Sequence, residues 1–356
     1  MTRLHLVNGF LGSGKTTAIV EAARQHMARG ERVGVVTNDQ GRYLVDTAFV
    51  RAEQIPVVQV TGGCFCCAYD QLLDVLTTLN DDTRPDVIYA ESVGSCADLV
   101  AAVVAPLEQR PDLGVTCRSL SVFADSRLLL RLLQRLPLPF GDDVLYIIDR
   151  QIEEAGVLVL NKVDLLDDGS RATLASLALD RLPGRPALMQ NSLTGPSVAR
   201  WVDLIEGCDV RLPGFPVPIS YDRYGAGETQ LAWVDRALVG SSGTNGREAV
   251  IIIIGAILGM FREHQVPIAH VKFFVSSPSE STKISFGTLD QPGWQGQIPR
   301  LTGRIELLLN ARVQADSQQT GAWVDAALAS ACARSGAAWE IVTGDTFAPR
   351  PPTRPR

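Results

Sequence analysis

The stretch "GFLGSGKT" at residues 9–16 fits the pattern G-x-x-x-x-G-K-[ST]. It follows the apolar run "RLHLVN" at residues 3–8 and leads into a helical pattern that ends at Gly30. A strand, a glycine-rich turn and a helix N-terminus in this order surround a phosphate with backbone N–H groups and the positive end of the helix dipole. The stretch therefore predicts a nucleotide phosphate site at the first strand–helix junction.

Each residue type in this loop has a physical role. The glycines let the backbone wrap around the phosphates, the ammonium group of Lys15 reaches the β- and γ-phosphates, and the hydroxyl of Thr16 binds Mg²⁺. The residues predicted to bind the nucleotide here are Gly9, Gly12, Ser13, Gly14, Lys15, Thr16 and Thr17.

Further apolar strands follow the loop and alternate with helical patterns. Val/Ile/Leu-rich runs lie at residues 32–39, 55–63, 85–92, 120–125 and 155–164, with helical stretches such as 68–80 and 97–109 between them. Near-continuous apolar strands alternating with helices are typical of a parallel sheet that is buried on both faces. The predicted fold class is α/β, a P-loop NTPase sheet with helices on both faces.

The pattern changes at residues 211–222, "RLPGFPVPISYD", where three prolines fall close together. We place a domain boundary there and predict a P-loop domain at 1–212, a smaller domain at 213–349 and a flexible tail at 350–356. The smaller domain reads as strands at 229–239, 269–277, 283–289, 304–314 and 338–344, with helices at 247–264 and 320–335. Apart from one extra strand this is an α+β, ferredoxin-like order, although the isoleucine-rich part of 247–264 also fits a strand.

The composition excludes several classes of protein. The 356 residues are 46% hydrophobic and 20% charged and carry a formal net charge of -6, so no positive field attracts nucleic acid. The longest apolar run, residues 249–261, is shorter than the roughly 20 residues that a membrane-spanning helix needs. The N-terminus has no signal-peptide pattern, which favours a cytoplasmic location, where clustered thiols indicate metal or redox chemistry.

The run "NKVD" at residues 161–164 ends a predicted strand and favours guanine over adenine. The carboxylate of Asp164 can accept hydrogen bonds from N1–H and N2–H of guanine, a pair that adenine does not offer. Asn161 can help to hold the guanine edge, and the stem of Lys162 can cover the face of the base. The sequence "NSLTG" at 191–195 is a weaker candidate for a contact to guanine O6.

Carboxylates follow two other predicted strands. Glu91 ends the strand at 85–92 and is predicted to hold the Mg²⁺ shell, although a strand-end carboxylate can also be a plain surface residue. Asp39 and Asp46 lie in residues 35–46, where a switch segment that senses the γ-phosphate is expected. The catalytic residues predicted from the sequence are thus Lys15, Thr16, Glu91 and Asp39.

Together, "GFLGSGKTT", "GGCFCC", "ESVG" and "QIEEAGVLVLNKVDLL" resemble the CobW-type family of P-loop GTPases, relatives of the nickel-insertion GTPases of hydrogenase and urease maturation. The resemblance covers roughly the first 200 residues. It implies GTP hydrolysis, a bound transition metal, zinc most often, and delivery of that metal to a client protein. The chain departs from the family pattern in the switch segment, where "NDQGR" replaces Asn-Glu-Phe-Gly-Glu. Asp39 and Arg42 therefore stand at the two glutamate positions. The chain also has only four histidines, which argues against metal storage.

Three cysteines, Cys64, Cys66 and Cys67, lie within four positions behind two glycines. The resemblance assigns the metal to them. Three thiolates leave one position of a tetrahedral zinc site open, which suits transfer of the metal. For all three side chains to reach one ion, the chain must turn near Cys66. Buried small side chains and a redox pair are the alternatives. The other cysteines are predicted to be core residues: Cys96, Cys117, Cys208 and Cys332. A role of His270 as a fourth ligand is left open.

We therefore predict a GTP-hydrolysing metallochaperone that binds GTP, Mg²⁺ and zinc and passes the metal to an unidentified client protein in a nucleotide-gated way. Cobalt or another transition metal is left open, since soft thiolates do not select one metal. No glutamine or arginine finger is visible, which predicts slow intrinsic turnover and leaves a homodimer open. The alternative is a GTP-dependent regulatory switch whose metal is structural or sensing and is not transferred.

Overall fold

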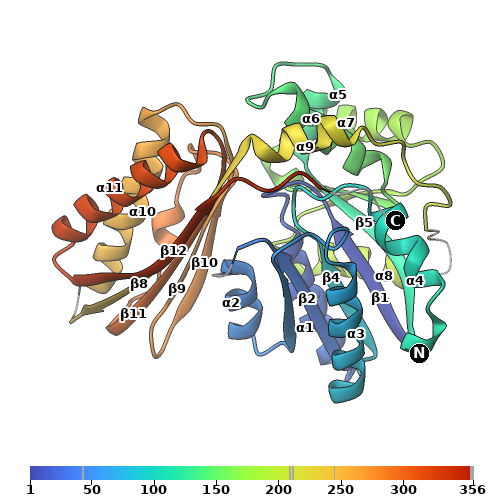
Figure 1. Cartoon of the computed structure of the whole chain (residues 1–356), viewed down its shortest axis with the longest axis horizontal. Helices are drawn as coiled ribbons and strands as arrows, with labels where there is room; N and C mark the ends of the chain where they lie inside the picture. The colour runs from blue at the N-terminus through green and yellow to red at the C-terminus, as the bar shows by residue number, and fades with distance from the viewer. Residues whose placement is uncertain (42–43, 208–209, 211, 244, 353–356) are drawn as a thin grey trace. The chain divides into compact units, whose positions relative to one another are not determined.

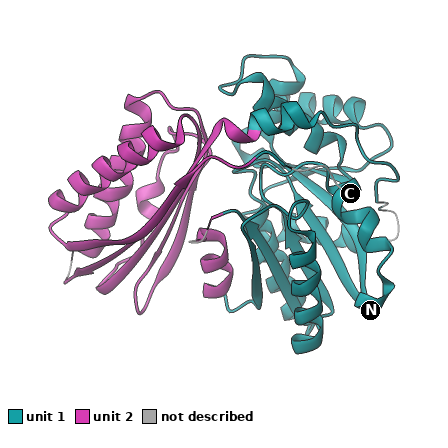
Figure 2. Cartoon of the chain, in the orientation of Figure 1, with its two compact units in different colours: residues 1–40, 53–227, 351–356 teal, residues 41–52, 228–350 magenta. Residues whose placement is uncertain are grey.

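The computed structural model describes residues 1–41, 44–207, 210, 212–243 and 245–352. These residues form two compact units (Figure 2). Residues 1–40, 53–227 and a short C-terminal stretch that begins at Pro351 form the first unit. Residues 41–52 and 228–350 form the second. The predicted limits 1–212, 213–349 and 350–356 rested on proline spacing alone and stay a prediction.

A seven-stranded parallel sheet forms the centre of the first unit, in the order β3-β2-β4-β1-β5-β6-β7. All residues of β4 and β6 are buried, as expected for strands covered on both faces. The strands are β1 (Thr2–Asn8), β2 (Val33–Asp39), β3 (Val57–Thr61), β4 (Val87–Glu91), β5 (Val115–Asp125), β6 (Val157–Asn161) and β7 (Ala187–Gln190).

Helices cover both faces of this sheet because its connections run in both directions from β1. The connection from β1 to β2 moves towards one edge and that from β3 to β4 towards the other, so right-handed crossovers place α1 and α3 on opposite faces (Figure 1). The helices are α1 (Lys15–Ala28), α3 (Tyr69–Thr83), α4 (Ala105–Glu108), α5 (Ser126–Leu133), α6 (Asp142–Glu153), α7 (Asp168–Arg181) and α8 (Gly195–Glu206), with short helical segments η1 (Val100–Val104), η2 (Pro111–Leu113) and η3 (Val163–Leu165). This confirms the predicted P-loop-type α/β fold.

The second unit contains a five-stranded antiparallel sheet in the order β10-β9-β11-β8-β12. Without the edge strand β10, the order is that of a ferredoxin-like sheet, as predicted. Helices α10 and α11 pack on one face over a common apolar core. The elements are β8 (Leu231–Ser242), α10 (Gly246–Glu263), β9 (Ile268–Ser276), β10 (Ser281–Phe286), η4 (Trp294–Gln297), β11 (Gly303–Gln314), α11 (Ser317–Arg334) and β12 (Ala338–Phe347). Helix α9 (Tyr221–Thr229) spans the point where the chain passes from the first unit to the second.

The isoleucine-rich segment is a helix rather than a strand. It lies within α10, whose buried side chains include Ile253, Ile254 and Ile257 in the core under the sheet. Among the described residues, no helix combines the length and the apolar character that a membrane span requires.

Helix α2 (Val45–Ala52) follows β2 in the sequence but packs within the second unit, against β9, β10 and β11. The carboxylate of Asp46 accepts hydrogen bonds from Lys272, at 2.6 Å, and from Lys283, at 3.0 Å. Burial alone would raise the pKa of Asp46, but the two ammonium groups hold it well below its usual range. The segment predicted to sense the γ-phosphate is therefore fixed to the second sheet at this carboxylate.

Candidate functional site

The glycine-rich loop joins the end of β1 to the start of α1. Gly9, Gly12 and Gly14 have φ values of 130°, 76° and 93°, which favour glycine. A Cβ atom at Gly9 would lie 2.0 Å from the carbonyl oxygen of Phe123, and one at Gly14 would lie 2.3 Å from Nδ2 of Asn161. The close approach of β5 and β6 thus requires glycine at both positions.

The N-terminus of α1 suits a phosphate. Its first turn contains no acidic residue. No carboxylate of the helix itself therefore competes with a phosphate for the free N–H groups and the positive end of the dipole. The buried hydroxyl oxygen of Ser13 has no hydrogen-bond partner among the described residues. Thr17, also predicted to bind the nucleotide, lies half-buried in the first turn. The loop therefore has the donors and the shape that a phosphate group needs.

Lys15, Thr16 and Glu91, three of the predicted catalytic residues, lie together at the carboxyl edge of the sheet. Thr16 Oγ1 donates a hydrogen bond to Glu91 Oε1 at 3.0 Å, and Lys15 Nζ lies 3.8 Å from the same oxygen. Lys15 Nζ also donates to the carbonyl oxygen of Gly9 at 2.7 Å. A hydroxyl and a carboxylate oxygen at this distance are ligands that Mg²⁺ prefers. Asp39, the fourth predicted catalytic residue, ends β2 and is half-buried.

The residues predicted to contact guanine lie at the end of β6. Asn161 donates from Nδ2 to the carbonyl oxygen of Ser13 at 2.7 Å and accepts on Oδ1 from Ser192 N–H and Oγ at 3.1 and 2.8 Å. Its side chain therefore ties the glycine-rich loop to the loop after β7. The Asp164 side chain is exposed. This bridging position of Asn161 does not follow from the spacing of residues in the sequence.

Asp125, at the end of β5, is a further residue that the sequence analysis missed. Its carboxylate accepts hydrogen bonds from Lys162 Nζ at 3.0 Å and from Arg127, including the backbone N–H at 3.0 Å that caps α5. Although burial opposes ionisation, the Arg127 and Lys162 contacts lower the pKa of Asp125 to about 2. Asp125 thus holds the side chain of Lys162 in place.

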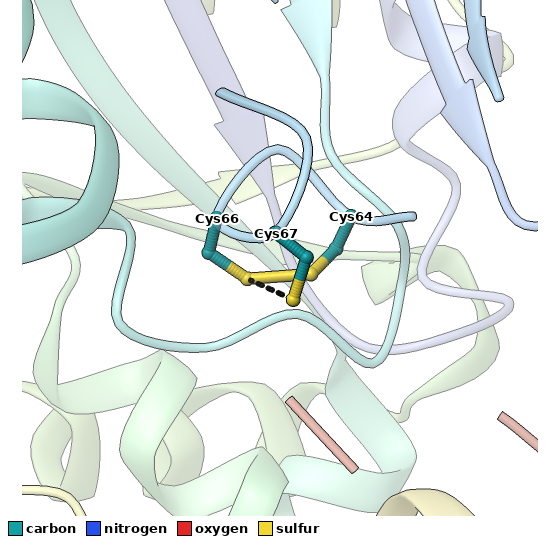
Figure 3. A group of neighbouring side chains, drawn as sticks. All are labelled: Cys64, Cys66 and Cys67. Carbon is teal, nitrogen blue, oxygen red and sulfur yellow. Dashed lines mark hydrogen bonds between the residues drawn. A yellow bond between two sulfur atoms is a disulfide. The ribbon is translucent and has the colours of Figure 1, made fainter. Parts of the chain in front are cut away.

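The three predicted metal ligands lie on one tight turn between β3 and α3 (Figure 3). The carbonyl oxygen of Cys64 accepts hydrogen bonds from the N–H groups of Cys67 and Ala68, which closes the turn expected near Cys66. The three sulfur atoms lie within 4.8 Å of one another, with Cys64 buried, Cys66 half-buried and Cys67 exposed. The Sγ atoms of Cys64 and Cys66 form a disulfide, and Cys67 Sγ lies 3.9 Å from that of Cys66. Metal binding by thiolates requires the reduced form of this turn.

Asn38, near the end of β2, positions the cysteine turn. Its Nδ2 donates to the carbonyl oxygens of Gly63 at 2.7 Å and Val60 at 3.2 Å, and its Oδ1 accepts from the N–H of Phe65 at 3.0 Å. The same oxygen lies 3.4 Å from the N–H of Val93, just after β4. One buried amide thus joins β2, at the start of the predicted switch segment, to the cysteine turn and to the loop that follows Glu91.

The remaining cysteines are only partly as predicted. Cys117 and Cys332 are partly exposed, and burial raises the pKa of the Cys117 thiol to about 12. Cys96 is fully buried, which confirms the prediction that it is a core residue, and its Sγ lies 3.5 Å from that of Cys66. Cys208 lies outside the described residues, as do Arg42 and the last four residues of the predicted tail.

His270, left open as a fourth metal ligand, is a buried residue of β9 in the second unit. It faces Arg312 of β11 in the register of the antiparallel sheet.

Comparison with known proteins places residues 3–187 in the family described as CobW/HypB/UreG, nucleotide-binding domain. The chain is 30% identical over 167 residues to the zinc chaperone YeiR of Escherichia coli (strain K12), covering 46% of this chain and 47% of that one. It is 27% identical over 205 residues to the zinc chaperone CobW of Sinorhizobium sp, covering 52% and 57%. The chain thus spans about half the length of the curated relatives it matches.

The solved structures that resemble the chain are more distant in sequence. The hydrogenase maturation factor HypB from Archaeoglobus fulgidus is 19% identical, with a TM-score of 0.42, over 58% of this chain and 90% of that one. The Zn(II)-bound YjiA GTPase from E. coli is 12% identical, with a TM-score of 0.38, over 91% of this chain and 98% of that one.

Proposed function

The chain belongs to the CobW/HypB/UreG family, and from this premise we propose that it is a GTP-hydrolysing metallochaperone. It binds zinc at Cys64, Cys66 and Cys67 and passes it to a client metalloprotein in a nucleotide-gated way. The observation that carries the proposal is the group of three cysteine sulfurs within 4.8 Å of one another, on a turn after β3. In a parallel sheet this turn lies at the same edge as the glycine-rich loop after β1.

The phosphate chemistry follows from the residues at that edge. The ammonium group of Lys15 and the N–H groups of the loop bind the β- and γ-phosphates and stabilise the negative charge that develops on them. Thr16 and Glu91 are the residues that would hold Mg²⁺, which supplies further neutralisation of the phosphate charge when bound. Asp39 would supply a second carboxylate from the end of β2, and attack of water on the γ-phosphate would give GDP and phosphate.

The preference for guanine rests on the end of β6. The exposed carboxylate of Asp164 accepts from the two adjacent N–H groups of guanine. The Lys162 side chain, held by Asp125 at 3.0 Å, covers one face of the base. Asn161 contributes by fixing the glycine-rich loop and the loop after β7 against each other.

Zinc is the proposed cargo because relatives named zinc chaperones match about half of this chain and because thiolates are ligands that zinc prefers. Nucleotide gating is supported by Asn38, which precedes Asp39 directly and bonds to the cysteine turn. A change at the end of β2 would reach the thiolates through this amide. The proposal includes a client metalloprotein and a homodimer that completes the catalytic site. No residue of this chain is assigned to either contact.

The proposal is tested by measuring zinc affinity in competition with a chromophoric chelator, on the full chain kept reduced with excess phosphine. The titration is run with Mg²⁺ and a non-hydrolysable GTP analogue and then with GDP. We expect tight binding that Cys66→Ser weakens, that Cys332→Ser leaves unchanged, and that differs between the two nucleotides. Coupled sites typically differ by 1–3 kcal/mol, about five- to 150-fold.

Two results would contradict the proposal in different ways. Cysteine-dependent zinc affinity that is equal in both nucleotide states would leave a GTPase with a structural metal and no gating. Zinc binding that survives Cys66→Ser unchanged would remove the cysteine turn as the metal site.

A further inference from the structure

A fourth sulfur, that of Cys96, lies beside Cys66 of the cysteine turn, whose own three sulfurs all lie within 4.8 Å of one another. Cys96 Sγ is 3.5 Å from Cys66 Sγ, and Cys66 Sγ is 3.9 Å from Cys67 Sγ. Four thiolates around zinc, each with a Zn–S bond near 2.3 Å, stand about 3.8 Å apart at the corners of a tetrahedron. Both observed separations are therefore close to those of sulfur atoms that share one ion.

Cys96 comes from a different element than the other three. It follows β4, five residues after Glu91, whereas the turn follows β3. Its backbone is held on both sides: its N–H donates to the carbonyl oxygen of Val93 at 2.9 Å, and its own carbonyl oxygen accepts from Gln151 at 2.8 Å and Asn8 at 3.2 Å. The core of the first unit thus fixes Cys96 next to Cys66.

The burial of the four cysteines supports the same arrangement. Cys96 is fully buried, and the sequence Cys64, Cys66, Cys67 runs from buried to exposed. A site with Cys96 at its floor and Cys67 at its mouth can receive an ion from outside and cover it with protein on the inner side.

We propose that Cys96 is the fourth ligand of the metal site, so that the chain alone supplies four thiolates to zinc. This inference rests on the proposed function, because it concerns the same ion. It replaces the open fourth position of a three-cysteine site with a closed one, and it assigns that position to the loop after Glu91.

Loading of this site begins with the reduced chain. The Cys64–Cys66 disulfide takes up two electrons and becomes two thiols: a dithiol reductant also supplies the two protons and leaves as a disulfide, whereas a phosphine leaves as its oxide and water supplies the protons and the oxygen. The four thiols then lose four protons as their sulfurs bind Zn²⁺. A four-thiolate zinc centre has a net charge of -2, and a client must displace at least one thiolate to take the metal.

The inference is tested by counting sulfur ligands with zinc K-edge X-ray absorption on the reduced, zinc-loaded full chain. We expect four sulfurs near 2.3 Å in the unaltered chain and three, with one lighter ligand atom, in Cys96→Ser. In the Co²⁺-loaded chain, the thiolate-to-cobalt charge-transfer absorption should fall by about a quarter in Cys96→Ser, since one of four thiolates is lost. Cys332→Ser, a partly buried cysteine of α11, is the matched control and should retain four sulfurs.

The outcomes separate this inference from the proposed function. Three sulfurs in the unaltered chain, with a further loss in Cys66→Ser and none in Cys96→Ser, would overturn the role of Cys96 and leave the proposed function standing. Zinc binding that no cysteine substitution in the turn affects would overturn both. Thermal unfolding of the zinc-free variants and their affinity for a GTP analogue show whether Cys96→Ser and the second variant, Cys96→Ala, are folded. If neither variant is folded, the sulfur count of the unaltered chain decides whether Cys96 is a ligand: four sulfurs support the inference and three overturn it.

Discussion

The amide of Asn38 gives a prediction that joins the stability of the chain to its metal affinity. Asn38 is 7% exposed and bonds to the cysteine turn at Gly63, Val60 and Phe65. In Asn38→Ala, the N–H of Phe65 and the carbonyl oxygen of Gly63 lose their side-chain partner inside the protein. A buried polar group left without a partner costs about 1–3 kcal/mol, so the expected loss of stability for the two groups is about 2–6 kcal/mol.

The same substitution should weaken zinc binding, because the ion must then order the turn that Asn38 otherwise holds. Fixing the backbone of one residue costs about 1–2 kcal/mol, and a factor of ten in affinity corresponds to about 1.4 kcal/mol. Loosening one or two residues of the turn therefore predicts zinc binding at least about fivefold weaker. Chelator competition on the reduced chain measures the affinity, and denaturant unfolding of the zinc-free protein measures the stability.

The matched control is Asn80→Ala, which removes an amide of α3 that bonds to Thr2 and Leu113 in the same unit but away from the turn. It should lower stability and leave zinc affinity unchanged. If Asn38→Ala loses stability but binds zinc as tightly as Asn80→Ala does, Asn38 only supports the fold and the argument that it positions the thiolates is wrong.

Three further predictions concern the two units separately. Gly9→Ala should abolish binding of a GTP analogue and lower the melting temperature, because its Cβ would lie 2.0 Å from a backbone oxygen of β5; unchanged calorimetric binding would refute the packing argument. Burial raises the pKa of Glu154 from 4.5 to about 7 in the folded protein. The contribution of Glu154 to stability is therefore greatest below pH 4.5, where the side chain is protonated in both states, and is lost as the pH rises through 7. Glu154→Gln should therefore stabilise the protein by roughly 3 kcal/mol at pH 8 and hardly at all near pH 4.5. Urea unfolding at both pH values measures this gain, and an equal gain at the two pH values would contradict the prediction. Asp46→Ala should cost about 3–5 kcal/mol because Lys272 and Lys283 would remain buried without their carboxylate, and a loss below 1 kcal/mol in denaturant unfolding would show that the pair is solvated.

The phosphate loop shows what local sequence can determine. Its function depends on glycine φ values, on a lysine and a hydroxyl at fixed spacing, and on a helix that begins at Lys15, all within a few residues of one another. Because the parallel sheet brings strand ends to one edge, the meeting of Thr16 with Glu91 also followed from the predicted strands.

Shorter or composite elements were harder to predict. The four-residue strand β7 and helix α2 carry too few residues for a periodic pattern to stand out. The isoleucine-rich segment was ambiguous because an all-apolar run has no period, and only its packing under the antiparallel sheet made it the helix α10.

The sequence by itself determined the phosphate loop, the order of the motifs, the three clustered cysteines and the class of each unit, since these depend on neighbouring residues. The tertiary structure decided that Cys96 lies against Cys66, that Asn38 holds the cysteine turn, and that α2 packs with the second sheet. Each of these contacts joins residues that are far apart along the chain. Their positions depend on how strands pair and side chains pack, and no spacing within the sequence records that.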